Sequence, residues 1–187
     1  QLGISTAPVE PTTYADPQGE VRLGGTCLNV GCIPSKALLR SSELYEEAGH
    51  AFEMHGITVA DLKVEIATMM RRKDNIVTQL TGGIRGLFKK NKITLLPGHG
   101  SFAGRESERW QIAVAGQDGA REVVAAQHVI VATGSCPRQL DGISVDNKMI
   151  CDNTGALALA GVPRRLGVIG AGVIGLAPGH HPELQPA

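Results

Sequence analysis

Cys27 and Cys32, separated by four residues, are the side chains of this 187-residue chain best suited to chemistry. A glycine pair precedes Cys27 and Pro34 follows Cys32, a composition typical of a loop that runs into a helix. A cysteine near a helix N-terminus is more acidic than usual, because the positive end of the helix dipole stabilises the thiolate. A thiolate beside a second cysteine can form a reversible, catalytic disulfide.

The spacing constrains any bond between these two sulfurs. In a regular helix, residues five positions apart are separated by about 7.5 Å along the axis. The Cα atoms of bridged cysteines lie only about 4.4–6.8 Å apart. A disulfide therefore requires either that Cys27 precede the regular helix or that the first turn be distorted. The spacing alone also leaves open a purely structural disulfide and a pair of buried free thiols.

The stretch GGTCLNVGCIPSKALL, which begins at Gly24, closely resembles the redox-active disulfide segment of the FAD-dependent pyridine nucleotide-disulfide oxidoreductases. Its second half matches the variant found in the branch that oxidises dihydrolipoamide. The resemblance implies that Cys27 exchanges with the substrate thiol and that Cys32 gives the thiolate that contacts the flavin. It also implies that Lys36, one helical turn after Cys32, lies near the reactive edge of the flavin. The cofactor-binding residues expected beside the pair are Gly24, Gly25 and Thr26.

Composition argues against several other classes of function. The chain is 42% hydrophobic and 19% charged, and its formal net charge is zero, so neither nucleic acid nor an anionic membrane is an expected partner. No apolar run reaches the roughly 18 residues of a transmembrane helix, and no signal peptide is visible. The four cysteines lack the dense spacing of a secreted framework, so we expect a cytoplasmic protein in which Cys136 and Cys151 are free.

Hydrophobic patterns predict an α/β fold. They indicate two helices, one over 35–49 and a long amphipathic one within 62–91. They also indicate short strands over 5–9 and 93–96, a β-hairpin of strands near 110–115 and 121–126, and a buried strand over 128–132. The solvated face of the long helix should carry Arg71, Arg72, Lys73, Lys89 and Lys90. By resemblance, residues 1–145 form a Rossmann-like FAD-binding domain with a β-hairpin insertion.

Several residues of this domain have expected roles in binding FAD. Glu10 ends the first strand, the position from which an acidic side chain accepts hydrogen bonds from a dinucleotide ribose. The resemblance places a backbone contact to FAD at Gly100, and it places the turn that closes the domain against the cofactor at Thr133, Gly134 and Ser135. No glycine-rich turn precedes Glu10, so we expect that the chain begins inside the first helix of the domain and binds FAD weakly or not at all.

A second nucleotide-binding motif lies near the end of the chain. An apolar segment that we expect to be a strand enters the pattern G-x-G-x-x-G at Gly170, Gly172 and Gly175, which is typical of a dinucleotide-binding turn. By resemblance, residues 146–177 are the start of an NAD-binding domain. Ala177 stands where the family has a glutamate, and Pro178 would end the following helix. Residues 178–187 are expected to be a disordered tail.

The resemblance implies an enzyme that oxidises dihydrolipoamide with NAD through FAD and the cysteine pair. It implies the lipoyl group of a 2-oxo-acid dehydrogenase complex as the partner, and homodimers among full-length members. No residue here matches the family's catalytic His-Glu pair, so we interpret the chain as a fragment truncated at both ends, with no metal site. Two alternatives remain: a related enzyme that acts on another disulfide or metal substrate, and a repurposed fragment that lacks turnover and serves as an interaction module or has an unrelated activity.

Overall fold

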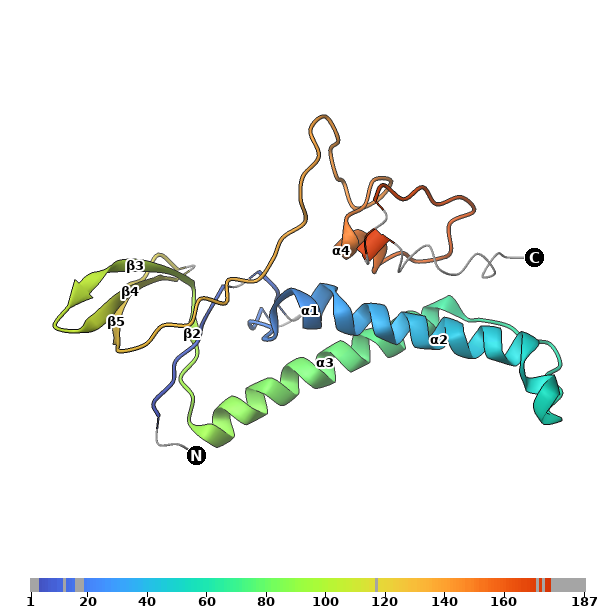
Figure 1. Cartoon of the computed structure of the whole chain (residues 1–187), viewed down its shortest axis with the longest axis horizontal. Helices are drawn as coiled ribbons and strands as arrows, with labels where there is room; N and C mark the ends of the chain where they lie inside the picture. Colours follow the sequence, from blue (N-terminus) through green and yellow to red (C-terminus); the bar gives the residue numbers. More distant parts are fainter. Residues whose placement is uncertain are drawn as a thin grey trace. The chain divides into compact units, whose positions relative to one another are not determined.

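The structure, a computed structural model, describes residues 4–11, 13–15, 19–116, 118–170, 172, 174 and 175. The chain divides into two compact units, and Figure 1 labels helices and strands of both. The first contains residues 1–25 and 79–135, and the second contains residues 26–78 and 136–187. Both helices and strands are present, as the α/β prediction requires. Within the described residues, no helix is both long and apolar enough to cross a membrane.

A short parallel strand pair lies in the first unit. β1 (Val9–Glu10) pairs with β2 (Leu96–Pro97), with Val9 opposite Leu96 and Glu10 opposite Pro97. The Leu96 amide donates to the Pro8 carbonyl over 3.0 Å, and the Gly98 amide donates to the Glu10 carbonyl over 2.9 Å. The predicted strands over 5–9 and 93–96 are therefore present near their expected positions but are only two residues long. Pro8 limits the pairing at the start of β1 because proline has no amide hydrogen to donate.

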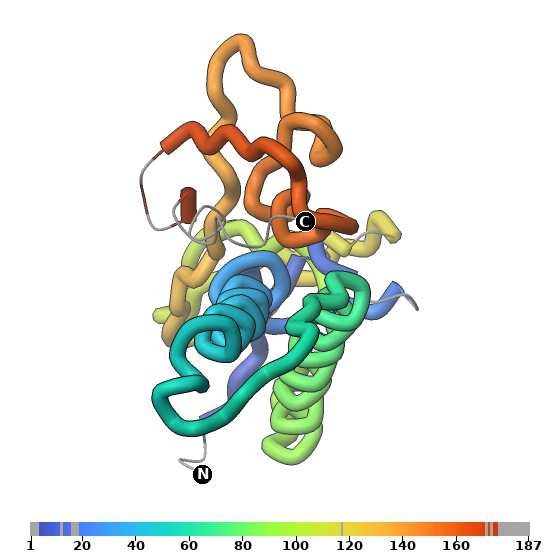
Figure 2. Tube along the Cα trace, turned by 90° about the vertical axis from the view of Figure 1, so that its right-hand side faces the viewer, coloured from blue at the N-terminus to red at the C-terminus, as the bar shows by residue number. Residues whose placement is uncertain are grey.

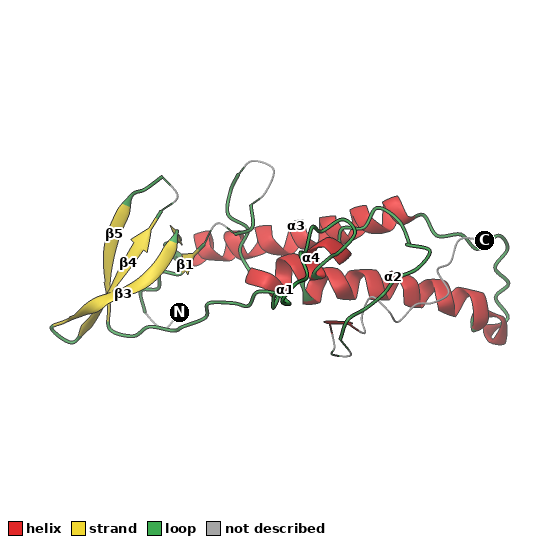
Figure 3. Ribbon diagram, turned by 90° about the horizontal axis from the view of Figure 1, so that it is seen from above, coloured by secondary structure: helices red, strands yellow, loops and turns green. Residues whose placement is uncertain are grey.

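The rest of the sheet structure in this unit is an antiparallel meander, in the order β3-β4-β5 (Figure 3). It consists of β3 (His99–Glu106), β4 (Arg109–Ala115) and β5 (Arg121–Ala126). The predicted hairpin of β4 and β5 is confirmed, whereas β3 was not predicted. β3 gives no alternating burial signal, since all of its residues are exposed. The Trp110 ring packs edge-on against Phe102, with centroids 5.4 Å apart, and Arg105 lies over its face at 5.3 Å.

Two predicted apolar strands are wrong. Residues 128–132 and the apolar run before Gly170 have no regular secondary structure, and Ile130 and Ile169 are 91% and 78% exposed. A run of β-branched residues favours an extended backbone, but a strand exists only where a neighbour accepts and donates its hydrogen bonds. Among the described residues, neither segment has such a neighbouring strand.

Helices dominate the second unit. α1 (Gly25–Val30) is followed by α2 (Cys32–His50), η1 (Phe52–His55), α3 (Ile66–Asn91) and α4 (Asn153–Ala156). α3 begins in the second unit and continues into the first. The predicted helices over 35–49 and within 62–91 are confirmed. In this unit α2 and the first part of α3 lie side by side and run in opposite directions (Figures 1 and 2).

Both helices carry buried apolar residues, and polar contacts join them. Pro34, Ala37 and Val77 are buried. The guanidinium of Arg72 donates to the Ala37 carbonyl over 2.9 Å and to the Ser41 hydroxyl over 3.4 Å. Arg72 is exposed, as expected for the solvated face of α3. Its guanidinium nevertheless links α3 to α2 through these hydrogen bonds.

The prediction that Lys73 faces solvent is wrong. Its side chain is 9% exposed, and its ammonium lies 3.0 Å from the Asp74 carboxylate. The same ammonium donates to the Leu157 carbonyl over 2.7 Å. Leu157 is the C-cap of α4, so Lys73 supplies a donor to the end of a distant helical turn. The other basic residues of α3 are exposed as predicted, namely Arg71, Lys89 and Lys90.

Lys73→Met should lower the free energy of unfolding, because Leu157 loses a charged donor inside the second unit. The expected loss is about 1–3 kcal/mol, measured by denaturant unfolding. Lys63→Met makes the same chemical change at an exposed position and should stay within about 0.5 kcal/mol of the wild type. Equal stabilities for the two variants would contradict this role of Lys73.

Candidate redox site

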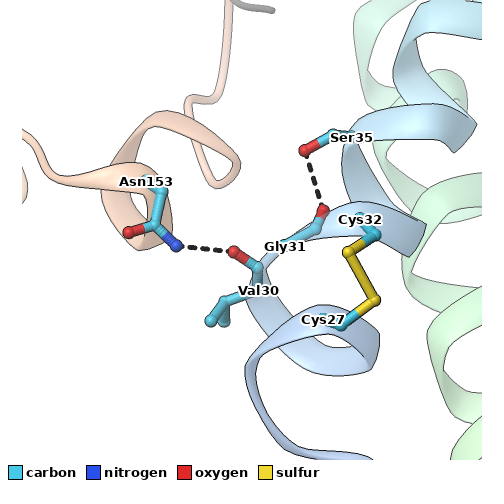
Figure 4. Close-up of a disulfide and its surroundings, with 6 residues drawn as sticks. All are labelled: Cys27, Val30, Gly31, Cys32, Ser35 and Asn153. Carbon is cyan, nitrogen blue, oxygen red and sulfur yellow. Dashed lines mark hydrogen bonds between the residues drawn. A yellow bond between two sulfur atoms is a disulfide. The ribbon is translucent and has the colours of Figure 1, made fainter. Parts of the chain in front are cut away.

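The central feature of the site is a disulfide between Cys27 and Cys32 (Figure 4). The two Cα atoms are 4.7 Å apart, within the range that a disulfide requires. α1 ends at Val30 and α2 begins at Cys32, so each cysteine belongs to a different helix. Cys27 therefore precedes the long helix α2. This is the first of the two geometries that the spacing allowed, the other being a distorted first turn. The pairing implied by the family resemblance is confirmed.

Gly31 forms the break between the two helices. Its backbone, at φ −138° and ψ −117°, is not helical. A Cβ atom at this position would lie 3.0 Å from the Thr26 carbonyl oxygen and 3.1 Å from the Cys27 Cα atom. Both neighbours are backbone atoms, which cannot rotate away as the end of a side chain can. Glycine is therefore needed here for close approach rather than for a left-handed conformation.

Two hydrogen-bonded carbonyls secure this break. The Gly31 carbonyl accepts from the Ser35 amide over 3.1 Å and from the Ser35 hydroxyl over 2.8 Å. The Val30 carbonyl accepts from the side-chain amide of Asn153 over 2.6 Å (Figure 4). The bond from the Ser35 amide is the first regular bond of α2, whereas the Val30 carbonyl ends α1 and needs a partner from outside its helix. Both peptide carbonyls between α1 and Cys32 are thus satisfied.

The surroundings of the disulfide favour thiol exchange. Cys27 and Cys32 are both exposed, so a small thiol can reach them. Cys32 is the first residue of the 19-residue helix α2, whose positive end stabilises a thiolate released there. Pro34 is almost fully buried in the first turn, where the missing amide hydrogen of proline has no cost. Lys36 is exposed one turn beyond Cys32 on the same helix.

A glycine pair shapes the entry to α1. Gly24 and Gly25 have φ values of 103° and 58°, in the left-handed region that side chains disfavour. The chain therefore turns sharply before Thr26 and Cys27, as the glycine pair predicted. The cofactor contacts expected of Gly24, Gly25, Thr26 and Lys36 stay predictions.

Two of the expected FAD-binding residues lie in or beside β1 of the first unit. Glu10 is half-buried at the carboxyl end of β1, and partial burial raises the pKa of its carboxyl group. Gly100 lies beside Val9, the residue before Glu10, since a Cβ atom on Gly100 would be 3.3 Å from Cγ1 of Val9. Ligands of α/β proteins bind outside the carboxyl ends of parallel strands, which is where Glu10 stands. Thr133, Gly134 and Ser135 lie in an exposed segment of the same unit without regular secondary structure.

The second nucleotide-binding motif forms a tight turn. Gly170 has φ 112°, and residues 174 and 175 are helical. A Cβ atom on Gly175 would collide with the Gly170 carbonyl oxygen and would lie 3.2 Å from Cγ1 of Val168. Such close packing is the role of the third glycine in a dinucleotide-binding turn. Gly172 lies exposed within this turn, whereas Ala177, Pro178 and the expected tail over 178–187 are outside the described residues.

Cys136 and Cys151 are free thiols, as predicted. Cys136 is exposed, and the Cys151 thiol donates to the Lys148 carbonyl over 3.7 Å. Throughout the described part of the chain, no group of three or more histidine, cysteine, aspartate or glutamate residues could hold a metal ion.

Sequence reasoning missed Asn153. Asp152 before it is a typical N-cap residue, and its carboxylate accepts from the Thr154 and Gly155 amides, so a helix start at this point was detectable. The contact from Asn153 to Val30 spans 123 residues and follows no local pattern.

Comparisons with known proteins agree with the geometry of the site. Residues 7–178 match a family model described as pyridine nucleotide-disulphide oxidoreductase. The chain is 58% identical to the dihydrolipoyl dehydrogenase of Cupriavidus necator over 94% of its own length and 36% of that protein. It is 49% identical to the mitochondrial dihydrolipoyl dehydrogenase 1 of Arabidopsis thaliana over 96% of its own length and 33% of that protein. The chain thus spans about a third of the length of these relatives.

A solved structure shares the fold. The crystal structure of LpdA from Mycobacterium tuberculosis matches 86% of this chain and 32% of its own, with a TM-score of 0.71 and 21% sequence identity. At that identity the match supports the α/β fold class.

Gly31→Ala should destabilise the oxidised chain by about 1–3 kcal/mol, because the new methyl group would press on backbone atoms of the preceding turn. Gly49→Ala is the matched control within α2, since a Cβ there makes only an ordinary contact, at 3.5 Å, with Leu62. It should be neutral or stabilising by up to about 1 kcal/mol. Denaturant unfolding measures both, and equal stabilities would contradict the close-approach role of Gly31.

Glu10 should make stability depend on pH. Its raised pKa means that the folded state binds the proton more tightly than the unfolded state. The contribution of Glu10 to the free energy of unfolding is therefore greatest below the ordinary glutamate pKa, and it declines as pH rises through the raised pKa. Glu10→Gln should remove this decline when unfolding is measured between about pH 4 and about pH 7. The same pH profile in both proteins would refute the burial effect.

Proposed function

Because the chain belongs to the pyridine nucleotide-disulphide oxidoreductase family, a family of enzymes, we propose that it carries the disulfide-exchange step of a flavin-dependent oxidation of dihydrolipoamide by NAD. The observation that carries this proposal is the exposed Cys27–Cys32 disulfide at the N-terminus of α2. The proposed substrate, dihydrolipoamide, is supported by the relatives from Cupriavidus necator and Arabidopsis thaliana, which are dihydrolipoyl dehydrogenases.

The exchange proceeds in two steps. A thiolate of dihydrolipoamide attacks the Cys27 sulfur, the sulfur–sulfur bond breaks, and Cys32 leaves as a thiolate. The second substrate thiol then attacks the mixed disulfide and releases lipoamide and the Cys27 thiol. Two electrons have then passed from substrate to protein. One substrate proton is on the Cys27 thiol, and the other went to solvent when the attacking thiolate formed, because Cys32 is left as a thiolate. The N-terminus of α2 stabilises the leaving Cys32 thiolate, which makes Cys32 the better leaving group.

FAD, when bound, supplies the electron acceptor for the reduced cysteine pair and donates in turn to NAD. The residues around the expected sites fit these groups. Glu10 offers an acceptor for ribose hydroxyls at the end of a parallel strand, and the packing of Gly175 against Gly170 leaves a tight turn of the kind that holds a pyrophosphate. The further residues proposed to line the FAD site are Gly24, Gly25, Thr26, Lys36, Gly100, Thr133, Gly134 and Ser135, and Gly172 completes the NAD turn.

The wider assignments follow from the family. We propose that residues 1–145 belong to the FAD-binding domain and residues 146–177 to the NAD-binding domain. The lipoyl group of a 2-oxo-acid dehydrogenase complex is the proposed partner, within a homodimeric enzyme of cytoplasmic location. These proposals are supported by the match to dihydrolipoyl dehydrogenases, of which the chain spans about a third.

Dihydrolipoamide should reduce Cys27–Cys32 to two thiols and leave as lipoamide. Alkylation of the product and mass spectrometry count the thiols, and Cys136→Ser, which alters a free exposed thiol, should not change the result at the pair. Reduction by glutathione but not by dihydrolipoamide would favour a related disulfide reductase. Resistance to both would sink the proposed exchange.

The roles of the two cysteines can be separated by trapping. In Cys32→Ser, the remaining Cys27 should open the ring of oxidised lipoamide and form a mixed disulfide, and alkylation of the lipoyl thiol released in this step should trap the adduct before the ring closes again. Cys27→Ser should form this adduct more slowly. Intact-mass measurement follows the adduct with time, and faster trapping at Cys32 would reverse the assignment of Cys27 as the exchanging thiol.

A further inference from the structure

A contact from a distant segment reaches the peptide between the two cysteines. Asn153 is the first residue of α4, and its side-chain amide donates to the Val30 carbonyl over 2.6 Å (Figure 4). Val30 is the last residue of α1, directly before the Gly31 break. Both residues belong to the second unit. The hydrogen bond therefore lies at the break between α1 and α2, the break that lets Cys27 and Cys32 approach each other.

The backbone that carries Asn153 is fixed on both sides. Before it, the Asp152 amide donates to Oδ1 of Asn147 over 3.1 Å, and the Asp152 carboxylate caps α4. After it, the Leu157 carbonyl accepts from the buried ammonium of Lys73 over 2.7 Å. Asn153 thus has a short side chain on a backbone turn that hydrogen bonds hold in place. Its amide therefore loses little conformational entropy when it binds the Val30 carbonyl.

The state of the disulfide and this hydrogen bond must influence each other. With the disulfide closed, the crosslink itself holds Val30 and Gly31 in place. With the disulfide reduced, α1 and α2 can move apart at Gly31, and the hydrogen bond then has to order the loop by itself. The bond is therefore stronger in the oxidised form. Because coupling is reciprocal, the bond favours the oxidised form to the same extent.

We propose that Asn153 is a positioning residue for the redox pair, which raises the effective concentration of the Cys27 and Cys32 thiols for one another. This inference rests on the proposed redox role of the pair. Asn153 touches neither sulfur; it acts through the Val30 carbonyl and the geometry of the break. Its removal makes the disulfide easier to reduce without changing either cysteine.

Equilibration with glutathione tests this directly. Two glutathione thiols are oxidised to one glutathione disulfide, and the Cys27–Cys32 bond takes up their two electrons and two protons to give two protein thiols. Acid quenching, alkylation and mass spectrometry give the effective concentration of the protein thiols. Asn153→Ala and Asn153→Asp should each lower it about threefold to tenfold, the effect of one lost hydrogen bond. The aspartate variant keeps the shape of asparagine but has no amide hydrogen to donate.

Asn147→Asp is the matched control. It introduces the same charge into the same segment, but the structure uses Oδ1 of Asn147 as an acceptor, which aspartate retains. Its effective concentration should equal that of the wild type. A shift in the Asn153 variants with none in Asn147→Asp supports positioning by the donated hydrogen bond. Unchanged values in the Asn153 variants, or an equal shift in Asn147→Asp, would overturn it.

A second measurement needs no variant at the site. In the wild-type chain, the NMR signals of the Asn153 side-chain amide should shift and exchange faster after reduction with dithiothreitol, while those of Asn147 stay in place. Asn153 signals that ignore the redox state would overturn the proposal. Neither measurement uses dihydrolipoamide, so failure of that substrate to reduce the pair would count against the proposed function and not against the role of Asn153.

Discussion

A bond between two sulfurs five residues apart cannot form within a regular helix, and the local structure around it depends on that constraint. The Cα atoms of Cys27 and Cys32 must approach to 4.7 Å, which is closer than helical rise allows. The chain meets this demand by ending α1 at Val30 and starting α2 at Cys32. Gly31 makes the junction possible, since its missing side chain lets two turns of backbone come into contact.

The same break creates a need for hydrogen-bond partners. Interrupting a helix leaves carbonyls that the regular pattern would have satisfied. The Gly31 carbonyl keeps the regular bond from the Ser35 amide, whereas the Val30 carbonyl accepts from Asn153, which is 123 residues away in the sequence. Lys73 then fixes the C-cap of the turn that carries Asn153. A geometric requirement at two cysteines is thereby linked to the packing of the second unit.

The candidate cofactor residues are distributed differently. Glu10 and Gly100 lie together in the first unit, beside the parallel pair of β1 and β2, whereas Gly170 and Gly175 form a closed turn in the second. Each group has a local feature that is typical of dinucleotide-binding sites, a carboxylate at a strand end or a glycine-packed turn. The disulfide and the candidate nucleotide-binding residues thus lie in separate short segments, each with its own backbone constraint.

The sequence by itself determined the local features. The glycine pair, C-x4-C and Pro34 indicated a turn before a helix. Helical periodicity located α2 and α3, and strand patterns located the hairpin of β4 and β5. These features could be predicted because each depends on residues close together in the chain. Only tertiary structure decided that Lys73 is buried, that residues 128–132 form no strand, and that Asn153 reaches Val30. Burial, strand pairing and this hydrogen bond need partners far away in sequence, and no local pattern specifies which partner is met.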